Sequence, residues 1–204
     1  VRFNTRVGAA VMEPSSRLKA IMSPTTGLDH LDLRTARKRQ IKVFHLRGQT
    51  KFLRTINPTA EMAVALMLAL GRNLVEASAS VLDGRWEAAP FRGHEVAGKT
   101  LGIVGYGRLG SKVARTAVAL DMAVLAHDVR PRRLAKDVRW ADDLSDLLER
   151  SDIVSLHVPL NDETAGMIGP MELARMQRHA VLINTARGAL VDSDALLDAL
   201  RSNR

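Results

Sequence analysis

Between residues 93 and 204, short apolar runs alternate with segments in which apolar residues recur every three or four positions. The short runs predict strands and the longer periodic segments predict helices. The predicted strands are Thr100–Val104, Ala123–Ala126, Ile153–Leu156 and Ala180–Ile183, and the predicted helices are Ser111–Leu120, Asp142–Arg150, Met171–Arg175 and Ser193–Arg201. This alternation favours an α/β fold in which an open parallel sheet carries helices on both faces.

The first 57 residues repeat the pattern on a smaller scale. The expected elements are strands at Val1–Val7, Leu18–Met22 and Ile41–Phe44, a helix start at Glu13–Ser16, a loop at Ser23–Gly27 and a basic helix at Leu31–Arg39. Because two of these strands are each followed by a loop and a helix, we expect a small α/β unit with parallel strands.

A long helix is predicted between the two parts, from about Thr59 to Ala79. Pro58 stands at its start, where a missing N–H costs little. Apolar residues from Met62 to Leu70 cover nearly all sides, so we expect this half of the helix to be buried. Such a helix is suited either to join two domains or to pack two subunits together. We therefore divide the chain into residues 1–57, a connecting helical region 58–92, and residues 93–204.

The stretch Leu101–Gly110 (LGIVGYGRLG) is typical of a dinucleotide-binding turn. In such a turn Gly105 permits the tight bend, Gly107 lets the backbone approach a pyrophosphate, and Gly110 lets the following helix pack close to the strand. The helix start then offers N–H groups and the positive end of its dipole to phosphates.

Asp128 ends the next predicted strand, 18 residues after Gly110. This is close to the spacing at which an acid accepts hydrogen bonds from the adenosine ribose, and its charge repels a 2′-phosphate, so NAD is favoured. Arg130, Arg132 and Arg133 follow closely and are suited to hold such a phosphate, which keeps NADP as the alternative. A solvated acid in a strand-end loop is the purely structural alternative.

Two further segments stand at the carboxyl ends of predicted strands, where ligands bind in open α/β sheets. They are residues 157–160 (HVPL) and 184–188 (NTARG). The guanidinium fork of Arg187 is able to hold a carboxylate and a carbonyl oxygen together. On spacing alone, an arginine after a strand is usually a surface residue or part of a structural ion pair, and this interpretation of Arg187 stays open.

These segments together resemble the D-isomer-specific 2-hydroxyacid dehydrogenases, the family that includes phosphoglycerate dehydrogenase. The resemblance rests on the glycine turn with Asp128, and on residues 157–160, 164–168 (TAGMI) and 184–192 (NTARGALVD). Nearer the N-terminus, residues 26–32 (TGLDHLD) are similar to the family's substrate-domain loop, and residues 59–61 (TAE) to the start of its inter-domain helix. The resemblance implies a Rossmann-type doubly wound parallel sheet plus a smaller, incomplete flavodoxin-like substrate domain.

The resemblance implies a role for each matching residue. Arg187 resembles the catalytic arginine that orients a 2-keto acid and stabilises charge on the oxygen being reduced. The backbone of Thr25, Thr26 and Gly27 resembles the cradle for the substrate's carboxylate. His30 and His157 are interpreted as structural, and no metal site is expected. On the cofactor side, the implied pyrophosphate contacts are Arg108 and Leu109, and the implied borders of the nicotinamide site are Val158, Pro159, Thr185, Ala186 and Arg187.

Two features depart from the family's pattern. The segment Leu46–Asn57 is longer and more basic than the family's usual connection, and we expect Arg47, Lys51 and Arg54 to border the substrate pocket and reach an anionic group. The family's catalytic acid is a histidine supported by a glutamate, both well beyond the arginine, and neither occurs in the 17 residues that follow Arg187.

We therefore expect the sequence to be the middle part of a longer protein, without the N-terminal start and the C-terminal catalytic pair. A positioned acid contributes about 10²–10⁴-fold to such a reaction, so we expect the chain as given to bind cofactor but to turn over poorly.

The amino-acid composition argues against several other classes of protein. The 204 residues carry a net charge of +8, but the basic residues are scattered and aromatic residues make up only 3%, which argues against nucleic-acid binding. There is no cysteine, which excludes thiolate chemistry, and no apolar run approaches a membrane span. We expect a cytoplasmic protein that does not enter a membrane.

The expected function is hydride transfer between NAD(H) and a small 2-hydroxy or 2-keto acid. The resemblance also implies a homodimer formed around the cofactor domains. The alternative is a catalytically inactive NAD(H)-binding protein, because the family's fold also serves co-repressors and fold alone does not fix function.

Overall fold

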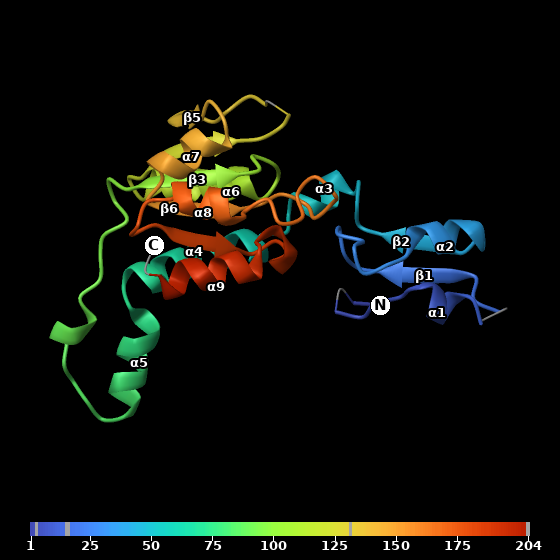
Figure 1. Ribbon diagram of the computed structural model, residues 1–204, viewed down its shortest axis with the longest axis horizontal. Coiled ribbons are helices and arrows are strands. Elements are labelled where there is room, and N and C mark those ends of the chain that lie inside the picture. Colours follow the sequence, from blue (N-terminus) through green and yellow to red (C-terminus); the bar gives the residue numbers. More distant parts are fainter. Residues whose placement is uncertain (3, 15–16, 131, 203–204) are drawn as a thin grey trace. The chain divides into compact units, whose positions relative to one another are not determined.

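The structure is a computed structural model that describes residues 1–2, 4–14, 17–130 and 132–202. The chain divides into two compact units, residues 1–56 and residues 57–204. The first unit contains a two-stranded sheet and the second a five-stranded sheet (Figure 1).

The sheet of the second unit is parallel throughout. Its strands pair in the order β5-β4-β3-β6-β7. They are β3 (Thr100–Val104), β4 (Ala123–His127), β5 (Val138–Trp140), β6 (Ile153–Leu156) and β7 (Val181–Asn184). The chain starts at the central strand β3, builds outward to one edge, then crosses back to build the other side. This is the predicted doubly wound arrangement, and it is confirmed.

Alternate residues of the central strands enter two different hydrophobic cores. Leu101 and Ile103 of β3 pack in one core, with residues of α4 (Pro58–Gly71) and α6 (Gly110–Ala119). Val104 packs in the other, with Leu147 and Leu148 of α7 (Leu144–Arg150). Residues of α8 (Pro170–Arg175) and α9 (Ser193–Arg201) extend this second core. Helices therefore cover both faces of the sheet. Successive side chains of a strand point to opposite faces, so apolar residues on both sides need a covering layer.

Asp152 fixes the amino edge of the sheet, just before β6. Its carboxylate accepts a 2.8 Å hydrogen bond from the N–H of Thr100 and lies 2.8 Å from His179 Nε2, with Lys99 Nζ at 3.6 Å. Burial raises the pKa of Asp152, but the hydrogen bonds from Thr100 and His179 and the charge of Lys99 outweigh it, so the pKa is lowered. Asp152 thus ties β3, β6 and the segment before β7 together at one end.

The elements predicted between residues 93 and 204 occur with small shifts at their ends, whereas β5 was not predicted. This strand has only three residues, and the polar Arg139 interrupts its apolar character. It lies at the edge of the sheet, where fewer positions need to be apolar.

The prediction of one helix from Thr59 to Ala79 is wrong. The structure has two helices here, α4 and α5 (Leu74–Leu82), with a break between Gly71 and Leu74. Asn73 at the break is left-handed, with φ of +49°. A single-turn helix, η1 (Ala89–Phe91), follows α5.

The expected burial of the first half is also wrong. The buried residues of α4 are Ala60, Ala63 and Met67, which form one stripe, whereas Met62 and Leu70 are more than half exposed. Leu66 and Leu68 of this helix are exposed as well. Within the described ranges no single helix is long and apolar enough to cross a membrane; only a pair bent by 69°, residues 50–71 with α5, passes that test together.

The first unit pairs β1 (Ala20–Ser23) with β2 (Lys42–His45) in parallel, as predicted. Its helices are α1 (Ala9–Met12), α2 (Leu33–Lys38) and α3 (Thr50–Leu53), and its core contains Met12, Ile21 and Ile41. The α3 turn lies within the basic segment Leu46–Asn57.

Two predictions in this unit fail. The strand at residues 1–7 is absent from its described part, where only Val7 makes a bridge, to Leu31. Polar residues and a turn from Thr5 N–H to the Arg2 carbonyl break that run. The helix start at residues 13–16 lies partly outside the described residues, and Glu13 instead ends α1.

Candidate functional site

The carboxyl ends of four neighbouring strands are in register. Val104 pairs with His127 on one side and with Leu156 on the other, and Leu156 pairs with Asn184. The residues that follow these strand ends therefore leave the sheet at the same edge. Since strands lie about 4.8 Å apart, the structure brings the glycine turn, Asp128, the 157–160 segment and the 184–188 segment to one continuous edge of the second unit.

The glycine turn leaves no room for side chains at its first and last positions. Gly105 has φ of +96°, and a Cβ there would lie 2.8 Å from Val158 Cγ1. At Gly110 a Cβ would lie 2.2 Å from the Gly105 carbonyl oxygen. At Gly107, by contrast, a Cβ would meet nothing within 4 Å. The turn is therefore packed tightly against the protein on both sides and open in the middle, next to the start of α6.

Tyr106 stabilises this turn from within, a role that the sequence reasoning missed. Its ring is 4% exposed and packs edge-to-face on Trp140, with ring centres 5.9 Å apart. Its hydroxyl oxygen accepts a 3.1 Å hydrogen bond from the N–H of Ala135. Tyr106 thus ties the glycine turn to the segment after β4. The sequence did offer one indication of this role, because Tyr106 is the only tyrosine in a chain with few aromatic residues.

Asp128 follows β4 at the same edge. Its Oδ1 accepts a 2.9 Å hydrogen bond from the N–H of Arg130, which orients the carboxylate. Within the described parts of the chain its Oδ2 has no partner. Arg130, Arg132 and Arg133 are exposed. The edge therefore offers one oriented, half-buried acid and three exposed cations nearby in sequence.

The segment after β7 is folded by the side chain of Asn184. Its Oδ1 accepts from the N–H of Ala186 at 3.0 Å, and its Nδ2 donates to the Arg187 carbonyl at 2.7 Å. The guanidinium of Arg187 donates in turn to the Ala186 carbonyl at 2.9 Å. Thr185 Oγ1 is buried at this edge and, in the portion of the chain that is described, has no hydrogen-bond partner. A compact turn thus presents a half-buried arginine and an unsatisfied hydroxyl.

His157 is a neutral residue in this structure. Burial lowers the pKa of its imidazole to about 4, and Nε2 lies 3.0 Å from Ser155 Oγ. At neutral pH the ring is therefore uncharged and is not available as an imidazolium acid.

In the first unit, the loop at Thr25–Gly27 has all three carbonyl groups engaged. The Thr25 carbonyl accepts from the N–H of Leu46 at 3.0 Å, the Thr26 carbonyl from Nε of Arg47 at 3.2 Å, and the Gly27 carbonyl from Thr25 Oγ1 at 2.7 Å. Among the described residues, the N–H groups of these three residues have no partner. Consecutive unpaired N–H groups suit an anion such as a carboxylate.

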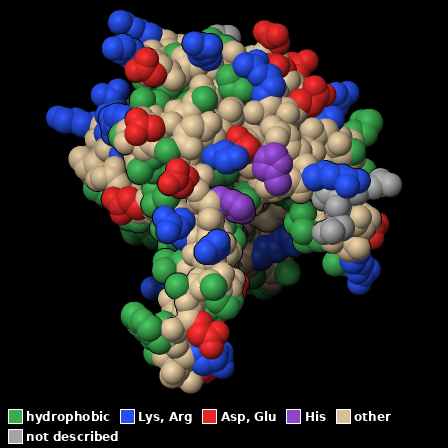
Figure 2. All heavy atoms as spheres, turned by 90° about the vertical axis from the view of Figure 1, so that its left-hand side faces the viewer, with side chains coloured by type: hydrophobic (Ala, Val, Ile, Leu, Met, Phe, Trp, Pro, Cys, Tyr) green, Lys and Arg blue, Asp and Glu red, His purple; other side chains and the backbone are tan. Residues whose placement is uncertain are grey.

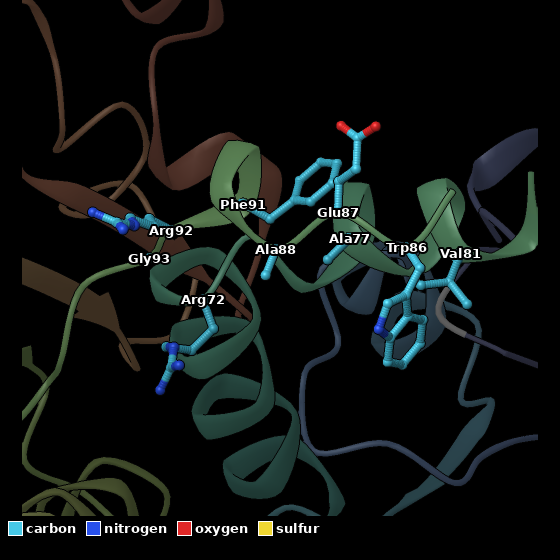
Figure 3. Close-up of a pocket in the computed structure, with 9 residues that line it drawn as sticks. All are labelled: Arg72, Ala77, Val81, Trp86, Glu87, Ala88, Phe91, Arg92 and Gly93. Atoms are coloured by element: carbon cyan, nitrogen blue, oxygen red, sulfur yellow. The ribbon is translucent and has the colours of Figure 1, made fainter. Parts of the chain in front are cut away.

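A cavity of about 570 Å³ lies elsewhere in the second unit (Figure 3). Trp86 and Val81 lie toward one end and Arg72 and Arg92 toward the other. Its lining comes entirely from residues 72–93, and none of the predicted site residues belongs to it. Among the described residues no group of three or more histidine, aspartate or glutamate side chains is placed to hold a metal ion.

Two family models cover the whole chain. Residues 64–204 match the NAD binding domain of the D-isomer specific 2-hydroxyacid dehydrogenases, and residues 1–119 match the catalytic domain of the same family. The chain belongs to this family.

Individual members of the dehydrogenase family are similar over nearly all of these residues. Hydroxypyruvate reductase of Thermotoga maritima is 36% identical over the whole chain, which covers 65% of that protein. D-3-phosphoglycerate dehydrogenase of Methanocaldococcus jannaschii is also 36% identical, and the chain covers 38% of it. The chain thus spans between about two fifths and two thirds of the length of these two relatives.

Solved structures agree. D-lactate dehydrogenase from Aquifex aeolicus, complexed with NAD and lactic acid, has a TM-score of 0.86 and 33% identity, with 100% of this chain and 60% of that one covered. The TT0316 protein from Thermus thermophilus has a TM-score of 0.84 and 40% identity, with 98% and 63% covered. The sheet edge described above lies within the NAD binding domain of this dehydrogenase fold.

The residues at that edge fit NAD. The open position at Gly107 leaves space for a pyrophosphate beside the start of α6, and the unpartnered Asp128 Oδ2 is an acceptor suited to a ribose hydroxyl. The buried Thr185 hydroxyl offers a further polar contact.

Proposed function

We propose that the protein is an NAD-dependent dehydrogenase that reduces a small 2-keto acid, or oxidises the corresponding 2-hydroxy acid. The observation that carries the proposal is the common sheet edge, which holds the open glycine turn, the oriented Asp128 and the turn that presents Arg187. When bound, NADH supplies the hydride that the reduction needs. Residues 1–57 act as the substrate domain, 58–92 as the connecting region and 93–204 as the cofactor domain.

In this proposal the cofactor residues divide by the part of the dinucleotide that they hold. Gly105, Gly107 and Gly110 with the backbone of Arg108 and Leu109 bind the pyrophosphate. Asp128 binds the adenosine ribose. Val158, Pro159, Thr185, Ala186 and Arg187 border the nicotinamide and exclude water from it.

Substrate binding uses two sets of N–H donors. The N–H groups of Thr25, Thr26 and Gly27 bind the carboxylate, because their carbonyl groups are already turned to internal partners. The guanidinium of Arg187 holds the carbonyl oxygen at C2 and stabilises the negative charge that develops there. The proton that neutralises this charge is not assigned to His157, because burial keeps its imidazole uncharged at neutral pH. Arg47, Lys51 and Arg54 favour a substrate with a second anionic group.

Replacement of Arg187 tests the reaction. In the complete gene product that contains residues 1–204, Arg187→Ala should lower kcat for NADH oxidation by a 2-keto acid by about 10²–10³-fold, since a donor to the developing oxyanion is lost. Arg187→Lys keeps the positive charge but loses the forked pair of donors, so its kcat should lie between those of the wild type and Arg187→Ala. The dissociation constant of NADH should change far less.

The assay uses glyoxylate, pyruvate and hydroxypyruvate in parallel. NADH binding without oxidation by any of them would contradict the proposed reaction and favour an NAD(H)-binding protein without turnover. Equal kcat values for the wild type and Arg187→Ala would contradict the proposed role of Arg187 in stabilising the charge on the carbonyl oxygen.

NAD rather than NADP is the proposed cofactor, because Asp128 repels a 2′-phosphate. NADPH should bind at least about tenfold more weakly than NADH, which corresponds to about 1.4 kcal/mol. Asp128→Asn, which removes the charge and keeps the size, should reduce this preference. Fluorescence titration with both nucleotides measures it. Tighter binding of NADPH by the wild type would show that the arginines at 130–133 decide the cofactor instead.

We also propose that the protein acts as a homodimer in the cytoplasm. The support comes from α5 and the segment after it, which project from the rest of the second unit (Figure 1). Apolar side chains are visible on this projection (Figure 2), and Leu82 and Trp86 are each 88% exposed. An exposed apolar surface of this kind is typical of a protein interface, and a second copy is the occupant that the resemblance implies.

Sedimentation tests the dimer. The wild type should sediment at twice the monomer mass, and Leu82→Glu combined with Trp86→Glu should sediment as a monomer, because both charges would be buried at the interface. Met171→Glu is the matched control, since Met171 is 74% exposed and belongs to α8 rather than to the projection. A wild-type monomer at micromolar concentration, or an equal effect of the control, would argue against this interface.

A further inference from the structure

Three side chains of the first unit form a hydrogen-bonded chain that ends in the loop at Thr25–Gly27. Ser23 Oγ lies 3.0 Å from His30 Nε2 and 2.9 Å from Thr25 Oγ1, and Thr25 Oγ1 lies 2.7 Å from the Gly27 carbonyl oxygen. Ser23 is 1% exposed and His30 is 5% exposed. Because water does not reach these two residues, the hydrogen bonds have to be made within the protein.

The last acceptor fixes the direction of the whole chain. A carbonyl oxygen only accepts, so the Thr25 hydroxyl donates to Gly27. Thr25 Oγ1 then accepts from Ser23, and the single hydroxyl hydrogen of Ser23 is used. Ser23 Oγ therefore accepts from His30, which requires a proton on Nε2.

The other ring nitrogen of His30 agrees with this assignment. Nδ1 is buried and has no partner among the described residues. A buried N–H without an acceptor costs more than a buried lone pair without a donor. Of the two tautomers, the one with its proton on Nε2 is therefore favoured. The ring is held in place by its burial and by the backbone, since the His30 carbonyl accepts from the N–H of Val7 at 2.8 Å.

We infer that His30 is a positioning residue for substrate binding: its Nε2 proton orders the hydroxyls of Ser23 and Thr25, which hold the Gly27 carbonyl away from the carboxylate. The inference rests on the proposed function of the 25–27 loop. With the proton on Nδ1 instead, Ser23 would donate to His30 and accept from Thr25, and the Gly27 carbonyl would lose its donor. A side chain without a donor at position 30 leaves Ser23 with one partner in place of two, so its rotation is no longer fixed.

The first arm of the test reads the ring directly. In the complete gene product with ¹⁵N-labelled histidine, the nitrogen shifts of His30 should show a protonated Nε2 and an unprotonated Nδ1 at neutral pH. This measurement needs no substrate. A proton on Nδ1 in the neutral ring would overturn the inference.

The second arm measures oxamate, an amide analogue of a 2-keto acid that accepts no hydride, by titration in the presence of saturating NADH. His30→Leu should weaken oxamate binding roughly 3- to 10-fold, the effect of one buried hydrogen bond. His30→Gln, which keeps an N–H donor, should recover most of this loss. Thr35→Val is the matched control, because it removes a hydroxyl of the same unit that donates to Asp32 at 2.7 Å, outside the chain.

The outcomes separate this inference from the proposed reaction. Oxamate binding that His30→Leu leaves unchanged, or that Thr35→Val weakens as strongly, would overturn the positioning role, as would a wild type that binds no oxamate. A wild type that binds oxamate in the predicted pattern but oxidises NADH with none of the 2-keto acids would contradict the reaction and leave the role of His30 supported.

Discussion

The close approach of α6 to β3 at the glycine turn is the contact on which the second unit depends. Only hydrogen fits between Gly110 and the Gly105 carbonyl oxygen, and that contact sets where α6 begins. The aligned strand ends then place three further segments beside the helix start. Asp152 holds the opposite edge in register, so the position of the site is a property of the whole sheet rather than of one loop.

The two units use different means to prepare polar groups for a ligand. In the second unit, short side chains fold each strand-end segment: Asp128 holds Arg130, and Asn184 holds Ala186 and Arg187. In the first unit, carbonyl groups are turned inward and N–H groups are left unpaired. Both arrangements order the binding groups before the ligand arrives, which is how a site gains affinity without added contacts.

Sequence reasoning was strongest where periodicity and burial coincide. The strands at Thr100–Val104 and Ile153–Leu156 are buried on both faces, so their apolar runs mark them fully. It failed where one residue changes the path of the chain: the left-handed Asn73 separates α4 from α5, and no pattern of apolar residues reports a backbone angle. The predicted burial of Met62 and Leu70 was wrong for a related reason: the sequence shows that a residue is apolar but not whether another part of the protein packs against it. Within the site, the spacing of Gly110 and Asp128 was visible in the sequence. Tyr106 acts through a contact with Ala135, far along the chain, and Ser23 acts through the directions of its hydrogen bonds, and spacing reports neither.

The central claim is that the open middle of the glycine turn receives the pyrophosphate of NAD. It is tested most directly by NADH titration of the wild type and of Gly107→Val, together with their thermal unfolding. Because a Cβ at this position meets nothing within 4 Å, the variant should unfold close to the wild-type Tm. Its NADH binding should be weakened at least about tenfold, since its side chain would occupy the space where the backbone meets the phosphates. A folded Gly107→Val variant that binds NADH as tightly as the wild type would contradict the account.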